Sequence, residues 1–322
     1  MSVLVYTESE NGKFKKNAHE VASYAYEVAK QLGTTATAIS INANSAGDLG
    51  DFGISKVLIV SNEQLKTFNA KAYAQVIAQA AEKETAKVII LSSSADTKFL
   101  APILTAQLKA GYVPNVVSAP ESTSPFKVKR TVFSNKGFAI TEISSDVKIV
   151  GVSNNAFGSA ENKTTATVES FDPSLGDDTF TTKSIEIDKV VGKATIADAD
   201  IVVSGGRGLK GPENWGMIEE LAEVLGAATA CSKPVSDLGW RPHGEHVGQT
   251  GKPVASNLYI AIGISGAIQH LAGVSSSKVK VVINTDPEAP FFKAADYGVV
   301  GDAFEVVPKL IEKLKEFKAQ NA

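Results

Sequence analysis

The chain has little of several residue types, and each shortage excludes a class of protein. A single cysteine, Cys231, stands in 322 residues, so no disulfide can form within the chain, which is typical of a reducing compartment. No uninterrupted apolar run reaches a membrane-spanning length, and the N-terminal segment lacks the charged start and apolar core of a signal peptide. We therefore expect a cytoplasmic protein without direct membrane insertion.

Charge of one sign is also lacking. The chain has 32 Lys and Arg residues against 35 Asp and Glu residues, a net charge of -3, and no long block of either sign. Binding to nucleic acid leaves a basic footprint on a protein, and this footprint is absent from the sequence. We therefore expect no nucleic-acid partner.

The first half of the chain alternates short apolar strands with amphipathic helices, which predicts an α/β fold with a parallel sheet covered on both faces. Beyond Val113 and as far as Asp188 the helical pattern disappears, and the strands there are predicted to form an antiparallel extension of the same domain. The predicted strands are 3–6, 36–41, 57–60, 88–91, 126–133, 138–143, 147–152 and 165–171, and the predicted helices lie near 18–32, 73–81 and 99–108.

Strand and helix alternation restarts at Ile201–Val203 and continues with strands at 258–264, 279–283 and near 298–300. This pattern predicts a second, smaller doubly wound sheet. We place the N-terminal α/β domain at residues 1–190 and the C-terminal domain at residues 191–322. The connecting segment 183–199 is compatible with a hinge.

Three loops rich in glycine and small polar residues follow strands of the second domain: Ser204–Gly211, Ser265–Gly266 and Asn284–Pro287. In an open parallel sheet, ligands bind where loops leave the carboxyl ends of the strands. We expect Gly266 to open a short helix that Gly273 closes, leaving amide groups free for an anion such as a pyrophosphate. His270 is expected to face this ligand and to stay neutral near the helix N-terminus until negative charge arrives.

Each of these patterns also has a simpler interpretation. An isolated histidine such as His270 is often a satisfied core or surface residue, although Ser265, Gly266 and Gln269 beside it favour a binding role. Gly206, Gly208 and Gly211 spell a nicotinamide-binding fingerprint, but such glycines are frequent in turns and the expected acid is only doubtfully matched by Asp237.

Two further candidates for chemistry are weaker still. His243 and His246, with Glu245 between them, resemble a metal pair, but no third ligand is suitably spaced, so a polar loop is the better interpretation. Cys231 has no identifiable triad partner, which favours a small buried residue over a nucleophile.

Long motifs in the second domain resemble the alpha subunit of electron transfer flavoprotein. They are Val247–Gly251, Leu258–Gly273, Asn284–Pro290 and Ala295–Gly298. The resemblance implies a heterodimer with a beta subunit that carries AMP, and one FAD held mainly by the second domain. It also implies an electron carrier without its own substrate turnover. Such a carrier takes electrons from flavin dehydrogenases, such as the acyl-CoA dehydrogenases of fatty acid oxidation, and passes them to a membrane quinone oxidoreductase.

The same resemblance implies a set of FAD contacts. Thr250 would lie at the flavin N5 and His270 at the C2 carbonyl, where negative charge gathers on reduction, while Ser265, Gly266 and Asn284 would serve the pyrophosphate, ribityl and adenosine portions. The implied cofactor-binding residues are Arg207, Ser232, Lys233, Val247, Gly248, Gln249, Thr250, Ser265, Gly266, Ala267, Ile268, Gln269, His270, Asn284 and Asp302. No catalytic or metal-binding residue is implied.

Lys233 is a departure from the family, which usually has an arginine over the flavin ring at this position. Lysine keeps the charge but loses the planar guanidinium, so we expect the same sign of tuning with a different magnitude. Two other functions remain open. One is an electron-bifurcating relative whose partner carries a second FAD and takes electrons from NADH, and the other is a stand-alone NAD-dependent dehydrogenase.

Overall fold

The computed structural model describes residues 2–133, 135–187, 196 and 199–321. Two compact units are present: Met1–Val132 with Gly137–Asp188 form the first, and Lys189–Ala322 belong to the second. The predicted boundary between residues 190 and 191, and most of the expected hinge at 183–199, lie outside the described residues.

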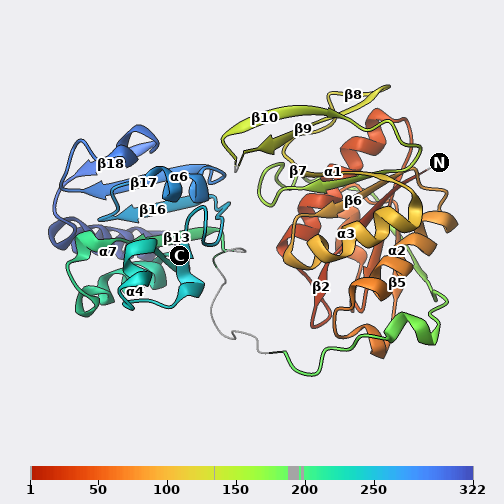
Figure 1. Cartoon of the computed structure of the whole chain (residues 1–322), viewed down its shortest axis with the longest axis horizontal. Helices are drawn as coiled ribbons and strands as arrows, with labels where there is room; N and C mark the ends of the chain where they lie inside the picture. The colour runs from red at the N-terminus through yellow and green to blue at the C-terminus, as the bar shows by residue number, and fades with distance from the viewer. Residues whose placement is uncertain (1, 134, 188–195, 197–198, 322) are drawn as a thin grey trace. The chain divides into compact units, whose positions relative to one another are not determined.

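A mixed ten-stranded sheet forms the centre of the first unit, in the order β10-β9-β7-β11-β6-β1-β4-β5-β12, with β8 paired to β9 (Figure 1). Its central strands are runs of aliphatic residues buried on both faces, as a sheet covered by helices requires. The strands are β1 (Val3–Thr7), β4 (Ala36–Ile41), β5 (Lys56–Val60), β6 (Val88–Ser92), β7 (Gly111–Val116), β8 (Ser122–Thr123), β9 (Phe126–Val132), β10 (Gly137–Glu142), β11 (Lys148–Val152) and β12 (Thr167–Ser170). A separate hairpin pairs β2 (Ser9–Glu10) with β3 (Lys13–Phe14).

Three helices cover the two faces of this sheet: α1 (Lys16–Gln31) on one face, and α2 (Ala70–Lys83) and α3 (Ala95–Leu108) on the other. Capping side chains explain where two of them begin. Asn69 accepts a hydrogen bond from the Ala72 amide at the start of α2, and Ser94 accepts one from the Thr97 amide at the start of α3. Short 3₁₀ turns lie at Gly47–Asp51, Glu63–Leu65 and Asp177–Phe180.

The antiparallel extension is smaller than the sequence predicts. Only β8, β9 and β10 belong to it, with β9 antiparallel to β7, β8 and β10. The strand β11 instead pairs in parallel with β6 and β7, and β12 pairs in parallel with β5. The expectation that residues 147–152 and 165–171 form antiparallel strands is therefore wrong, because both segments return to the central parallel sheet.

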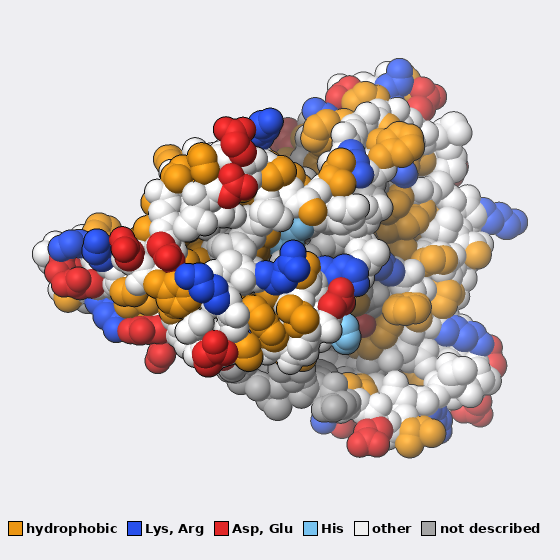
Figure 2. All heavy atoms as spheres, turned by 60° about the vertical axis from the view of Figure 1, so that its left-hand side comes forward, with side chains coloured by type: hydrophobic (Ala, Val, Ile, Leu, Met, Phe, Trp, Pro, Cys, Tyr) orange, Lys and Arg blue, Asp and Glu red, His pale blue; other side chains and the backbone are white. Residues whose placement is uncertain are grey.

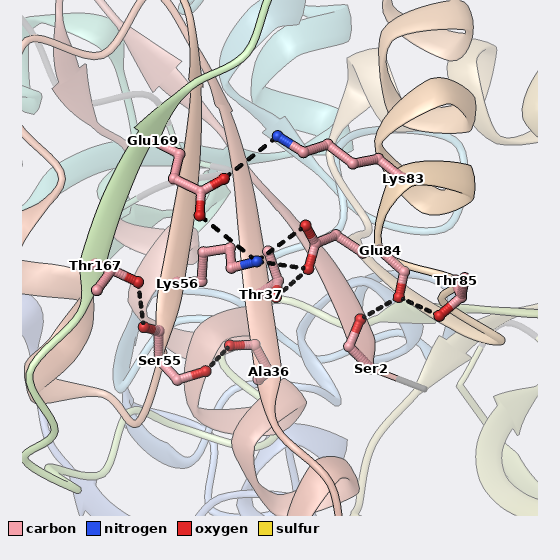
Figure 3. A network of polar contacts seen from close by, with 10 residues as sticks. All are labelled: Ser2, Ala36, Thr37, Ser55, Lys56, Lys83, Glu84, Thr85, Thr167 and Glu169. Carbon is pink, nitrogen blue, oxygen red and sulfur yellow. Dashed lines mark hydrogen bonds and ion pairs between the residues drawn. The ribbon is translucent and has the colours of Figure 1, made fainter.

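A polar network ties the exposed edge strand β12 to the rest of the first unit (Figure 3). The Lys56 ammonium group lies 3.2 Å from one carboxylate oxygen of Glu84 and 3.7 Å from Glu169 on β12. Lys83 adds a second contact to Glu169 at 3.3 Å, and Thr37 donates to Glu84. These side-chain contacts add to the backbone pairing between β12 and β5 and help to hold the edge strand in place.

The second unit is an all-parallel six-stranded sheet in the order β15-β14-β13-β16-β17-β18. Counted from β13, this is the strand order 3-2-1-4-5-6 of a doubly wound dinucleotide-binding sheet. The strands are β13 (Ile201–Gly205), β14 (Ala228–Ser232), β15 (His246–Val247), β16 (Leu258–Ile262), β17 (Val279–Asn284) and β18 (Tyr297–Val300). The chain reverses its direction of winding between β13 and β16, so the loops after these two strands border the switch point.

Helices cover both faces of this second sheet (Figure 1). Buried side chains of α4 (Gly216–Leu225), α5 (Lys233–Asp237) and α7 (Ala303–Gln320) pack on one face, and α6 (Ile268–Val274) packs on the other. Further 3₁₀ turns lie at Arg207–Leu209, Pro212–Asn214, His243–Glu245 and Pro290–Lys293. The predicted fold class, α/β with a parallel N-terminal sheet and a doubly wound C-terminal sheet, is confirmed.

Candidate functional site

A pocket of about 830 Å³ opens at the carboxyl edge of the second sheet. Residues that follow β13, β14, β15, β16 and β17 all contribute to its lining, so the loops that the sequence places at one edge do meet there. This volume lies within the usual range for small-molecule and cofactor sites. The lining residues are Arg207, Gly208, Ser232, Lys233, Pro234, Asp237, Leu238, His246, Val247, Gly248, Gln249, Thr250, Gly263, Ile264, Ser265, Ala267, Gln269, His270, Asn284 and Asp286.

Peptide groups in direct contact join the two loops at the switch point. A Cβ added to Gly206 would lie 2.1 Å from the Gly263 carbonyl oxygen, and one added to Gly208 would lie 2.6 Å from the Gly263 Cα. The Gly206 amide donates to the Ile262 carbonyl and the Gly208 amide donates to the Gly263 carbonyl. Because Gly206 and Gly208 have no side chains, the two loops can lie in direct contact.

This use of the glycines differs from the nicotinamide-binding fingerprint. In that fingerprint the glycine turn leads directly into a helix whose N-terminus meets the pyrophosphate. Here α4 begins only at Gly216, five residues after Gly211, and the intervening chain forms one 3₁₀ turn, Pro212–Asn214. The resemblance of Gly206, Gly208 and Gly211 to the fingerprint is thus a matter of spacing alone.

A second backbone contact joins the loop at residues 247–251 to α6. The Gln249 amide donates to the Gln269 carbonyl at 2.8 Å, and a Cβ on Gly273 would lie 2.6 Å from the Gly248 Cα. The helix α6 starts at Ile268 and continues through Gly273 to Val274. The expectation that Gly273 closes this helix is therefore wrong, because its missing side chain is used for the approach of Gly248.

His270 lines the pocket but is 94% shielded from solvent, with only 6% of its surface exposed. Its Nε2 atom forms a hydrogen bond with the hydroxyl of Tyr259 on β16, at 2.9 Å. The pKa of His270 is lowered to about 4, mainly by burial and in smaller part by the nearby His246, while the Val247 backbone acts in the opposite direction. His270 is therefore neutral at pH 7, as expected, but burial and His246 cause this, whereas the sequence had suggested the helix N-terminus.

Reasoning from the sequence missed His246 as a pocket residue. Its side chain lines the pocket and is 7% exposed, and burial lowers its pKa, as does the positive charge of Lys233. The position of His246 directly before the loop at residues 247–251 is the signal that could have found it. The pocket thus holds two neutral histidines beside the Lys233 ammonium group, which is paired with Asp237 at 3.1 Å.

Twelve of the fifteen predicted binding residues line the pocket, and Gly266, Ile268 and Asp302 do not. Gly266 is buried at φ +84°, where a Cβ would lie 2.5 Å from the Phe291 amide nitrogen. Ile268 is 62% exposed to solvent, and Asp302 caps α7 by accepting a hydrogen bond from the Phe304 amide. Contact with FAD stays a prediction for all fifteen residues.

The alternative chemistries find little support in the geometry. Glu245 accepts two hydrogen bonds from the Arg241 guanidinium, at 2.6 and 2.8 Å, and His243 is hydrogen-bonded to Ser236. Among the described residues, no group of three or more potential metal ligands lies together. Cys231 is fully buried, and burial raises the pKa of its thiol to about 12, which suits a core residue and opposes a nucleophile.

The surface of the molecule carries both signs of charge. On the face drawn in Figure 2, acidic and basic side chains are interspersed, and neither gathers into a broad patch on the described residues. Across the described part of the chain, no helix combines the length and the apolar character that crossing a membrane demands.

Comparisons with known proteins agree with the geometry. The family model described as "Electron transfer flavoprotein domain" matches residues 3–175, and the one described as "Electron transfer flavoprotein FAD-binding domain" matches residues 195–275.

Relatives resemble the chain over nearly its full length. The alpha subunit of electron transfer flavoprotein from Bacillus subtilis (strain 168) is 37% identical, over 98% of this chain and 97% of the relative. The corresponding subunit of Thermoanaerobacterium thermosaccharolyticum is 35% identical over 98% of each chain, and the mitochondrial subunit of Arabidopsis thaliana is 33% identical over 99% of this chain and 91% of its own. The chain therefore belongs to the electron transfer flavoprotein alpha subunit family.

Proposed function

We propose that the second unit of this chain binds FAD in the pocket beside His270 and that the chain works as the FAD-carrying subunit of a soluble electron shuttle. The observation that carries this proposal is the position of the pocket at the switch point of a 3-2-1-4-5-6 sheet. A matching FAD-binding family model over residues 195–275 supports it independently.

The residues present fit a flavin dinucleotide. The buried Nδ1 atom of His270 has no hydrogen-bond partner among the described residues, although its side chain lines the pocket. Polar groups at the rim, on Ser232, Gln249, Thr250 and Ser265, can orient a polar ring system, and the exposed Arg207 offers a cation for a phosphate. Bound FAD would supply one- and two-electron redox chemistry.

His270 would give this pocket its electrostatic character. As a neutral imidazole in a buried site, it costs little desolvation while the pocket holds no net charge. Negative charge brought into the pocket would favour a hydrogen bond from His270 or its protonation. The protein would thereby stabilise the reduced cofactor relative to the oxidised one, which raises the reduction potential.

The wider scheme is also a proposal. The chain pairs with a beta subunit that binds AMP, receives electrons from flavin dehydrogenases such as acyl-CoA dehydrogenases, and delivers them to a membrane quinone oxidoreductase. The names of the relatives support an alpha subunit that carries electrons, and hence a partner subunit.

Co-expression with the candidate beta subunit, followed by cofactor extraction and counting, tests this function. We expect a yellow heterodimer with one FAD and one AMP, and reductive titration should show uptake of electrons at the flavin. Two FAD per heterodimer would instead indicate the bifurcating relative. A colourless complex, or NAD-dependent turnover by the isolated chain, would refute the proposal. The absence of a helix directly after Gly211 makes the stand-alone dehydrogenase the weaker alternative.

The Lys233→Arg variant tests whether this position tunes the flavin. Lys233 lies at the pocket with its ammonium group 3.1 Å from Asp237, so part of its charge is already compensated. An arginine at this position would spread the charge over a planar group that can stack on a ring. We expect a shift in flavin potential at constant FAD content, and unchanged potentials would show that Lys233 does not contact the flavin.

A further inference from the structure

We infer that Tyr259 is a positioning residue of this pocket: its hydroxyl holds the His270 ring through Nε2 and selects the tautomer that carries its proton on Nδ1. This inference extends the proposed function. It rests on that function only for the experiment that measures the flavin potential. Tyr259 does not line the pocket and acts through His270.

The surroundings of Tyr259 make it a rigid support. Tyr259 lies on β16, the strand between β13 and β17, and its side chain is fully buried. The Phe291 ring stacks parallel to it, with ring centroids 6.3 Å apart and planes 1° apart. Phe291 reaches this place because Gly266 has no side chain, which gives the buried Gly266 a role although it does not line the pocket.

The hydrogen-bond donors and acceptors around Tyr259 favour one direction for the bond to His270. A neutral imidazole has one N–H donor and one acceptor nitrogen, and a phenol can act as either partner. On the neighbouring strand, Ser204 lies two residues beyond Val202, the residue that pairs with Tyr259, and therefore on the same face of the sheet. The Oγ atom of Ser204 has no hydrogen-bond partner among the described residues, so within the described part of the chain the Tyr259 hydroxyl bonds to Nε2 of His270 alone.

The Tyr259 hydroxyl therefore donates to Nε2 of His270, because a phenol that accepted from Nε2–H would leave its own buried O–H without an acceptor. The proton of the neutral ring then lies on Nδ1, the nitrogen that has no hydrogen-bond partner among the described residues. A protonated ring would donate from Nε2 instead, and the Tyr259 hydroxyl would then accept that bond.

Tyr259→Phe tests this role, because it keeps the ring and its stacking on Phe291 and removes only the hydroxyl. Selective ¹⁵N labelling makes the four histidines of the chain observable, and His270→Gln identifies the His270 signals. In the full chain purified with its partner subunit, we expect Nδ1 to be the protonated nitrogen of His270. The variant should lower the ratio of the two tautomers about tenfold, the factor that one hydrogen bond of typical strength supplies.

Flavin potential gives a second readout. The equilibrium constant for the first electron should fall about tenfold in Tyr259→Phe, which corresponds to about 59 mV for a one-electron step. In a His270→Gln background the same change should have no effect on the potential, because Tyr259 acts through His270.

Tyr24→Phe is the matched control. Tyr24 is also fully buried, but it lies in the first unit and its hydroxyl has no hydrogen-bond partner among the described residues. It should leave the His270 signals and the potential unchanged. A wild-type protein with its proton on Nε2, an unchanged tautomer ratio in Tyr259→Phe, or an equal shift in Tyr24→Phe would each overturn the inference. A protein purified without flavin would refute the proposed function. The tautomer measurement would then still test the role of Tyr259.

Discussion

The carboxyl edges of the two parallel sheets differ in kind, although both sheets are built from the same alternation of strand and helix. In the first unit, side chains that are hydrogen-bonded to Glu8 occupy part of this edge. Glu8, 3% exposed, accepts hydrogen bonds from Ser92 at the end of β6, from Asn17 and from Lys15. In the second unit the corresponding edge consists of glycine-rich loops that surround a pocket of about 830 Å³.

Both sheets have a carboxyl edge at which a ligand could bind. The comparison shows that the residues at that edge determine whether a pocket forms there. At the first edge the Glu8 carboxylate already has partners, so a ligand at that point would have to break buried hydrogen bonds. At the second edge peptide groups form the floor, and His270 retains a ring nitrogen that has no hydrogen-bond partner in the described part of the chain. The following variants test how far the two edges differ, from the largest expected effect to the smallest.

Gly206→Ala should damage the second edge most. The new Cβ would lie 2.1 Å from the Gly263 carbonyl oxygen, and neither backbone can move away without breaking the sheet. We expect a loss of more than about 3 kcal/mol in the stability of the second unit, together with loss of flavin binding. Tryptophan fluorescence during urea unfolding measures it, because Trp215 and Trp240 both belong to the second unit.

Gly216→Ala is the control for this change, since a Cβ at Gly216 has nothing within 4 Å and alanine favours the helix α4. It should leave stability unchanged or slightly raised. Equal destabilisation by the two variants would show that the loop contact at Gly206 is unimportant.

Glu8→Ala should break the first edge and leave the second intact. Removing this carboxylate takes away the acceptor of the Asn17 amide and leaves the buried Ser92 hydroxyl only its longer contact with Thr97, which we expect to cost about 3 kcal/mol. Hydrogen exchange should speed up at β1 and β6, while flavin content stays the same. The exposed Glu161→Ala serves as the control, and a fall in flavin content with Glu8→Ala would contradict the separation of the two edges.

The stability of the cofactor-free second unit should fall in acid because of His270. Its folded pKa of about 4 lies below the ordinary value of 6.5, so the unfolded chain binds the proton first as the pH falls. The stability that the neutral His270 contributes is fully present above pH 6.5 and is lost progressively toward pH 4. The loss amounts to about 2 kcal/mol by pH 5. Urea unfolding at pH 7 and pH 5 measures it, and His270→Gln should remove this part of the pH dependence.

Glu169→Gln should have the smallest effect. Glu169 lies on the exposed strand β12, where solvent screens its charge, and it contacts Lys56 and Lys83. We expect a change of less than about 0.5 kcal/mol, with faster exchange confined to β12. If Glu169→Gln lowered the stability as much as Glu8→Ala, exposed and buried polar networks would contribute equally. The buried hydrogen bonds of Glu8 would then not distinguish the first carboxyl edge.

Local pattern predicted most strands of the first unit but missed β7, and in the second unit it missed β14 and the helix α4; it also did not predict all of the pairings. The strands at residues 148–152 and 167–170 form where the β-branched runs predict them, yet they pair in parallel with β6, β7 and β5. The partner of a strand is chosen by contacts distant in sequence, and the absence of a helix before these strands suggested hairpins. The disagreement therefore concerns topology, while the class of fold is confirmed.

The candidate site divides in the same way. Glycine-rich loops at the ends of strands were sufficient to predict that Arg207, Ser265 and Asn284 would meet at one edge. The burial that makes His270 neutral, and the presence of His246 beside it, depend on packing between strands that spacing along the chain does not reveal. Likewise, Gly273 looked like a helix end because its close neighbour, Gly248, is distant in sequence.

The glycine-to-glycine contact between the loops after β13 and β16 has a practical consequence for redesign. Because the base of the cavity is made of peptide groups, with the Gly208 amide donating to the Gly263 carbonyl, its shape depends little on which side chains surround the opening. Randomising Arg207, Lys233, Gln249 and Thr250 in a variant library should therefore retune affinity and redox behaviour while the scaffold beneath stays the same.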